Sequence, residues 1–71
     1  MNTRQVAAHF VNFNGRILPM HVVVICNGKV TECFPLKEEI AMTEWLGGTI
    51  EIRNMEDGAY QSAFWKGKLL K

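Results

Sequence analysis

The stretch Met20–Val30 reads MHVVVICNGKV and decides the fold. Its first part, Met20–Cys26, is almost continuously apolar and rich in β-branched residues, which favours an extended strand. The dipeptide Asn27-Gly28 follows, and Asn-Gly tolerates the positive φ angles of a two-residue hairpin turn. A second such dipeptide, Asn14-Gly15, lies upstream between two other β-rich runs. Together these features predict a three-stranded antiparallel meander.

The strands of this meander are expected over Gln5–Phe13, Met20–Cys26 and Val30–Leu36. Pro19 complicates the second strand because it has no N–H to donate to a ladder. Either the paired strand begins after Pro19, or a bulge lies there.

Beyond the meander the periodicity changes. The segment Lys37–Leu46 carries an apolar stripe at helical spacing and ends at Gly47-Gly48, which predicts a helix of two to three turns. Thr49–Arg53 alternates as a half-buried strand does, and Ala59–Trp65 predicts a last strand after a turn. The tail, residues 66–71, would extend that strand or fray.

The predicted fold is therefore mainly β with one short helix, in the order β-β-β-α-β-β, as one small domain over residues 1–71. The strand at Met20–Cys26 is apolar on both faces, so a second layer must cover it. We expect a small sandwich or a partly open barrel with the helix closing one end. The expected core consists of Val23, Ile25, Val30, Phe34, Leu46, Ile50, Ile52 and Phe64.

Composition excludes several classes of protein. With 71 residues, 48% of them apolar, and a formal charge of +1, the chain is not an intrinsically disordered protein. The near-zero charge makes a nucleic-acid or anionic-membrane partner unexpected, although Phe64–Lys68 has the aromatic and basic residues of a single-strand binder. The longest apolar run, Val22–Cys26, is too short to cross a bilayer, and no secretory signal is visible. We expect a cytoplasmic protein.

The two cysteines are predicted to be unpaired small hydrophobes. A two-residue loop at Asn27-Gly28 places Cys33 opposite Val22, four residues from Cys26. That separation is roughly 13 Å along the strand, and a disulfide tolerates at most about 7 Å between Cα atoms.

No metal or cofactor site is predicted. A two-residue loop at Asn14-Gly15 pairs Phe13 with Arg16 and Ala8 with His21, so that His9 and His21 point to opposite faces of the sheet. A bulge at Pro19 would shift this parity and could bring the two imidazoles together. Even then, two histidines supply only half of a four-ligand zinc site.

The chain shows no catalytic constellation, because it has no nucleophile motif, no phosphate loop and no dinucleotide fingerprint. We therefore expect a protein that is not an enzyme. Glu32 is unusual because it lies between Val30 and Phe34 on an otherwise apolar face. With His21 it forms the candidate ligand pocket, although an edge position would also explain it.

Residues 7–52 resemble the small N-terminal β domain of amidohydrolase-superfamily enzymes. The resemblance rests on residues 8–13, on 17–25, on Asn27-Gly28-Lys29-Val30, and on the run Glu44–Ile50. In that family a Pro-Gly turn and a His-x-His metal pair follow, in a barrel of several hundred residues. Here Glu51–Met55 follows instead. The resemblance therefore implies a non-catalytic β module, without the barrel and without its catalytic residues.

The function expected first is a structural or protein-interaction module that self-associates as a homodimer or higher even oligomer. The last predicted strand has no charge and no proline to guard a free edge, and its candidate interface residues are Tyr60, Ser62, Phe64 and Trp65. The identity of any other protein partner cannot be read from the sequence. The alternative is a small-ligand-binding or accessory domain of a hydrolase-like system.

Overall fold

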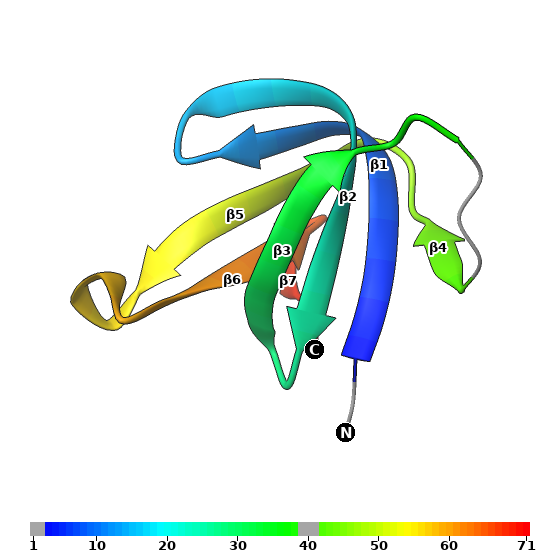
Figure 1. Ribbon diagram of the computed structural model, residues 1–71. Coiled ribbons are helices and arrows are strands. Elements are labelled where there is room, and N and C mark those ends of the chain that lie inside the picture. The colour runs from blue at the N-terminus through cyan, green and yellow to red at the C-terminus, as the bar shows by residue number, and fades with distance from the viewer. Residues whose placement is uncertain (1–2, 39–41) are drawn as a thin grey trace.

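The computed structural model describes residues 3–38 and 42–71, and it is built almost entirely from strands (Figure 1). One 3₁₀ turn, η1 (Glu56–Gly58), joins two of them. The strands are β1 (Thr3–Phe13), β2 (Arg16–Cys26), β3 (Lys29–Pro35), β4 (Thr43–Trp45), β5 (Thr49–Met55), β6 (Tyr60–Trp65) and β7 (Lys68–Leu69).

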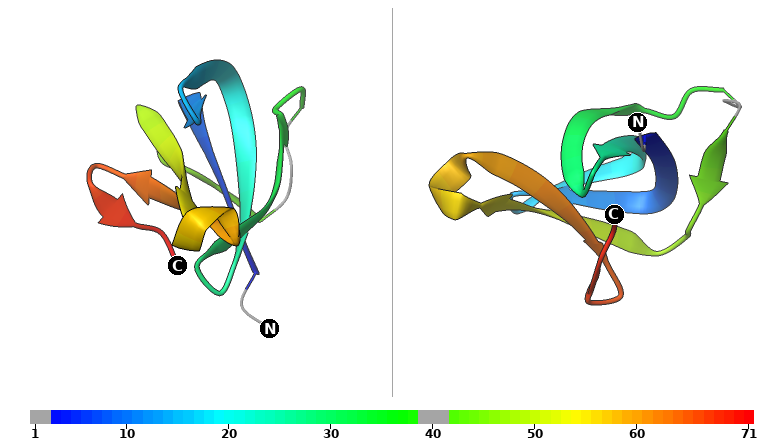
Figure 2. Two further views of the ribbon diagram at one scale, coloured as in Figure 1. Left: turned by 90° about the vertical axis from the view of Figure 1, so that its left-hand side faces the viewer. Right: turned by 90° about the horizontal axis from the view of Figure 1, so that it is seen from below.

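The strands form one sheet in the order β3-β2-β1-β5-β6-β7, and β4 also pairs with β1. Strand β1 is central: β2 runs antiparallel along one side, and β4 and then β5 run parallel along the other. The sheet is strongly curled, so the turn between β2 and β3 comes close to the C-terminal end of the chain (Figure 2). There the Ser62 hydroxyl donates a hydrogen bond of 2.8 Å to the carbonyl oxygen of Gly28.

Both predicted hairpin turns are confirmed. Asn14 and Gly15 have φ angles of 52° and 91°, and Asn27 and Gly28 have 52° and 79°, which are the left-handed values that a type I′ turn requires. The predicted pairs follow: Phe13 lies opposite Arg16, and Cys26 lies opposite Lys29.

The β1–β2 ladder is kinked near Pro19, but both predicted alternatives are wrong: β2 begins before Pro19, and the ladder keeps one register across it, without a bulge. The ladder passes from Ala8–His21 to Phe10–Pro19, and Met20 between them adopts a left-handed φ of 50°. The carbonyl oxygen of Met20 accepts a 2.8 Å hydrogen bond from the N–H of Leu36. The kink changes which residues face the core, because Ala8 before it and Val11 after it are both fully buried.

A bulge in the β2–β3 ladder corrects the predicted register. The pairing shifts between Val24 and Ile25, so Cys33 lies opposite Val23 and not Val22. One extra residue in β3 has this effect because side chains alternate with period two. The same shift separates Glu32 from Val30: Glu32 pairs with Val24, on the other face of the sheet from Ile25 and Val30.

The predicted helix over Lys37–Leu46 is wrong in its second half. Thr43–Trp45 forms β4, parallel to Gln5–Ala7 of β1, and the N–H of Leu46 donates to the carbonyl oxygen of Ala7 at 2.8 Å. Residues 39–41 of that prediction lie outside the described residues. The unpaired edge of β1 accounts for the difference, because a buried strand must satisfy its backbone groups on both sides.

The tail neither extends β6 nor frays. Lys66 and Gly67 form a turn with φ angles of 52° and 77°, and β7 folds back along Phe64 and Trp65. Leu70 then reaches the core, where its side chain is 6% exposed.

The core lies inside the curled sheet. Its buried cluster consists of Val6, Ala8, Val11, Val23, Ile25, Ile50, Ile52, Ala63 and Leu70. Val30 and Leu46 pack at its margin, as expected for core residues. Phe34 and Phe64 are only half-buried and lie outside this cluster, because their cross-strand partners, Val22 and Glu51, are not on its face.

Candidate functional site

The registers place a continuous row of side chains across five strands. Cross-strand partners share a face of a sheet, so each pair links the row to the next strand. From β2 to β7 the row contains Ile17, Asn12, Glu51, Phe64 and Leu69. The two ends are apolar and open to solvent, since Ile17 is 55% exposed and Leu69 is 41% exposed.

A second, shorter row lies beside it. Phe10 pairs with Pro19 on β2 and with Thr49 on β5, and its side chain is 46% exposed. We call the two rows, together with Arg53, the outer face. The opposite side of the same strands carries Val11 and Ile50, both fully buried, so the outer face is the solvent side of this part of the sheet.

One ion pair lies within the outer face. The Arg53 guanidinium contacts the Glu51 carboxylate at 2.9 Å and lies over the Phe64 ring, 4.8 Å from its centroid. Both ionic side chains are about half exposed, so the pair contributes little to stability. Its importance is the charge pattern, because it leaves the outer face electrically neutral with one acid and one base at its middle.

The structure separates the four predicted interface residues. Phe64 lies on the outer face, but Trp65 packs against the core and donates from Nε1 to the carbonyl oxygen of Gly47 at 2.9 Å. Ser62 is 2% exposed, and Tyr60 lies under the ammonium group of Lys29, 4.9 Å from its ring centroid. The predicted free edge of this strand is covered in part, because β7 pairs with Phe64 and Trp65 on the side away from β5.

The structure does not bring Glu32 and His21 into one pocket. His21 pairs with Pro35 and Glu32 with Val24, which puts the two side chains on opposite faces of the β2–β3 ladder. His21 instead donates from Nδ1 to the carbonyl oxygen of Pro19 at 2.9 Å.

His9 also makes contacts of its own. Its Nδ1 accepts a 3.1 Å hydrogen bond from the N–H of Gly48, and its ring meets the Trp45 ring edge-on with centroids 4.9 Å apart. No group of three metal-ligating side chains was found among residues 3–38 and 42–71.

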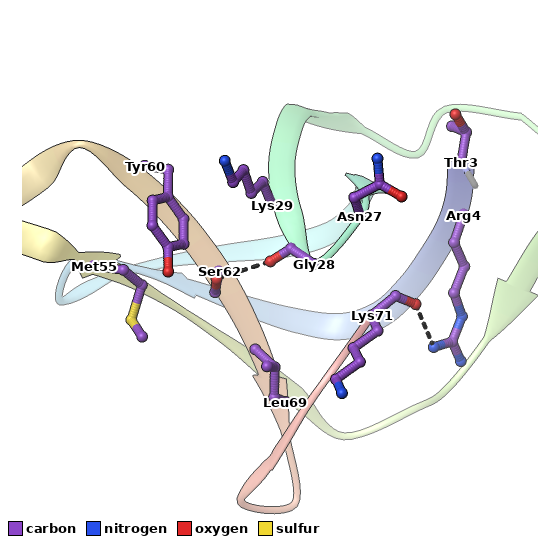
Figure 3. A pocket seen from close by; sticks show the side chains of 10 residues that line it. All are labelled: Thr3, Arg4, Asn27, Gly28, Lys29, Met55, Tyr60, Ser62, Leu69 and Lys71. Atoms are coloured by element: carbon purple, nitrogen blue, oxygen red, sulfur yellow. Dashed lines mark hydrogen bonds between the residues drawn. The ribbon is translucent and has the colours of Figure 1, made fainter. Parts of the chain in front are cut away.

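A cavity of about 730 Å³ lies where the β2–β3 turn meets β6 and β7 (Figure 3). Arg4, Lys29, Tyr60, Ser62 and Lys71 are among its lining residues. The sequence does not predict this cavity, because its walls come from both ends of the chain and from the β2–β3 turn, and only the curling of the sheet brings them together. Tyr60 and Ser62, predicted for an interface, are part of it.

Among the described residues, Arg4, Glu44 and Cys33 have shifted pKa values, and the pKa of Arg4 is raised by its hydrogen bond to Glu44. The Arg4 guanidinium holds the Glu44 carboxylate by two hydrogen bonds, of 2.6 and 3.0 Å, and these lower the pKa of Glu44. Burial against the core raises the pKa of the Cys33 thiol, and both cysteines are free.

No known protein family, curated protein or solved structure matches this chain. Of the helices within the described residues, none has the length and apolar character needed to cross a membrane.

Proposed function

We propose that this protein is a non-enzymatic interaction module that self-associates through its outer face into a twofold dimer. The observation that supports the proposal is the exposure of Phe10, Ile17 and Leu69 on one side of a folded sheet. Apolar side chains exposed to solvent favour association, because burying them removes apolar area from water. The curled sheet, which we regard as a partly open barrel, supplies a rigid support for them.

The pattern of the outer face favours a second copy of this chain as the partner. A twofold axis parallel to the row, passing between Glu51 and Arg53, brings the Ile17 ends of the two copies together. The same operation brings each Glu51 within reach of the partner's Arg53. An isologous interface must be self-complementary in this way, and a neutral face with one acid and one base satisfies that condition.

The size of the molecule sets the expected strength. A stable interface buries about 800 Å² on each partner, and the whole chain exposes 4813 Å². Such an interface would take about a sixth of the surface, and the outer face offers few large exposed apolar side chains to it. We therefore expect a dimer that dissociates on dilution through the micromolar range.

The first test is sedimentation equilibrium across a dilution series, comparing the parent with Ile17→Glu. Ile17 is 55% exposed, so the variant should keep the fold while placing a charge at the end of the row. The matched control is Met42→Glu, which adds the same charge at a residue that is 90% exposed and outside the outer face. We expect dissociation for Ile17→Glu alone. A parent that stays monomeric at high micromolar concentration would contradict the proposal.

A charge exchange tests the twofold geometry itself. Glu51→Lys places the new lysine opposite the partner's Arg53 in the proposed dimer. Arg53→Glu places the new glutamate opposite the partner's Glu51. Each single variant should weaken the dimer, and the double variant should restore it. Failure of the double variant to recover would place the interface elsewhere.

The cytoplasmic location and the kinship with amidohydrolase-superfamily β domains stay predictions. An accessory role in a hydrolase-like system would need a partner protein on the outer face in place of the second copy. In that case Ile17→Glu would leave the mass in solution unchanged.

A further inference from the structure

The cavity of about 730 Å³ has a volume within the range of small-molecule sites. Figure 3 shows Ser62 hydrogen-bonded to Gly28 between Tyr60 on one side and Lys71 with Arg4 on the other. Because Ser62 is 2% exposed and its hydroxyl is fixed by Gly28, this wall is formed before any ligand arrives.

The charged side chains lining the cavity have one sign, and the Arg4 guanidinium also donates to a main-chain oxygen of Lys71 at 3.4 Å. Three of the lining residues are cationic, namely Arg4, Lys29 and Lys71, and none of the described lining residues is acidic. The charge of Arg4 is already balanced by Glu44. Within the described part of the chain, neither Lys29 nor Lys71 forms an ion pair through its side chain. The unpaired side-chain charges in the cavity are therefore those of Lys29 and Lys71, which match an anion.

The other wall is apolar and aromatic. Met55 and Tyr60 are cross-strand partners at the β5–β6 turn, and both line the cavity together with Leu69. The ammonium group of Lys29 lies 4.9 Å from the centroid of the Tyr60 ring, so a cation and a ring are held side by side. A ligand that uses both would carry its charge next to a flat apolar group.

We propose that this cavity binds a small organic anion with an aromatic ring. Lys29 and Lys71 contact the anionic group, and the ring lies against Tyr60, Met55 and Leu69. The site adjoins the outer face, because Leu69 belongs to both and Ser62 in the cavity is the cross-strand partner of Arg53.

The test is a titration with phenyl phosphate followed by amide chemical shifts, carried out on the parent and on the Ile17→Glu variant, which is designed to be monomeric. We expect saturable shifts centred on residues 27–29 and 60–62 in both proteins. Saturation in the variant but not in the parent would show that the dimer covers the site and would leave the anion site standing. No saturation in either protein at low millimolar concentration would overturn it.

Lys29→Gln is the decisive variant, and Lys66→Gln is its matched control. Lys66 also lies over an aromatic ring, 4.6 Å from the centroid of Trp65, but it does not line the cavity. We expect Lys29→Gln to weaken binding about fivefold, the effect of one partly solvated charge pair, and Lys66→Gln to leave it unchanged. Equal losses in the two variants would overturn the assignment to the cavity.

Two further ligands separate the parts of the proposal. Benzyl alcohol has the ring without the charge, and inorganic phosphate has the charge without the ring. Each should bind more weakly than phenyl phosphate. If benzyl alcohol binds as tightly as phenyl phosphate, the cavity does not recognise the anionic group. If inorganic phosphate binds as tightly as phenyl phosphate, the aromatic wall does not contribute to binding. Either result would overturn the proposal.

Discussion

Cys33 shows at the scale of one residue how a bulge changes the chemistry of a side chain. The extra residue in β3 turns Cys33 toward the core, where burial raises the pKa of its thiol. Cys33 lies opposite Val23, three residues from Cys26, so the two cysteines are about 10 Å apart along the strand. That distance still exceeds what a disulfide tolerates.

We predict that Cys33 reacts slowly with iodoacetamide in the folded protein at pH 8 and rapidly in urea. A raised pKa leaves less thiolate at a given pH, and the thiolate is the nucleophile. The folded state favours the protonated thiol of Cys33. Its contribution to the free energy of unfolding is therefore complete below the pKa of the unfolded state and is lost as the pH rises through the pKa of the folded state. Mass spectrometry of the alkylated peptides measures both rates.

Two results would contradict this picture. Equal alkylation rates for Cys33 in folded and unfolded protein would mean that the residue is exposed and that the bulge is misplaced. A monomer lighter by two hydrogens after non-reducing alkylation would mean that Cys26 and Cys33 form a bridge.

At the scale of the element, the kink in the β1–β2 hairpin depends on a residue in a left-handed conformation. Met20 has a φ of 50°, a conformation that costs an L-residue roughly 1–2 kcal/mol and costs glycine little. Its side chain is 43% exposed, so little packing depends on it.

We therefore predict that Met20→Gly stabilises the protein by about 0.5 kcal/mol, since relief of the left-handed strain slightly exceeds the added chain entropy. Met20→Val should destabilise it by about 1 kcal/mol, because a β-branched residue tolerates positive φ poorly. Urea unfolding of the two variants beside the parent measures the difference. The reverse order of stabilities would show that the hairpin is straight.

The elements that were predictable are those set by local chemistry. The two Asn-Gly turns fix both hairpins because the turn itself selects the pairing on either side. The kink at Met20 and the bulge before Glu32 depend on how the sheet curls. Neither could therefore be predicted from the local sequence. The segment Lys37–Leu46 shows the same limit. Its apolar spacing is typical of a helix, but Thr43–Trp45 forms a strand because it pairs with the otherwise free edge of β1. The local sequence cannot predict that pairing.

The candidate sites depend even more on distant parts of the chain. Phe64 was identified from its own strand, and it lies on the outer face. Phe10 and Ile17 were missed because their exposure follows from the kink, which reverses the faces of β1 and β2. The signal that could have found them was the run Ile17–Met20, four residues without a charge on a strand interrupted by proline.

At the scale of the whole molecule, stability depends on a thin core. Ile25 is fully buried in the cluster that joins β1, β2, β5 and β6. We predict that Ile25→Ala destabilises the protein by about 2–5 kcal/mol, the range for truncating a buried isoleucine. Because a small domain has only about 5 kcal/mol in total, the variant should be largely unfolded at moderate temperature. Thermal unfolding followed by circular dichroism measures this, and a melting temperature within two degrees of the parent would contradict the core assignment.

The central position of β1 has a consequence for synthesis on the ribosome. The hairpin partner of β1 follows it directly, but Phe13 pairs on its other side with Ile52, which is made 39 residues later. At a translation rate of about 5–20 residues per second, that interval lasts roughly 2–8 s. During this time one edge of β1 is open to any other nascent strand, and such edges are templates for aggregation. The order in which the strands emerge thus makes the first hairpin the part of this chain that most needs protection before folding is complete.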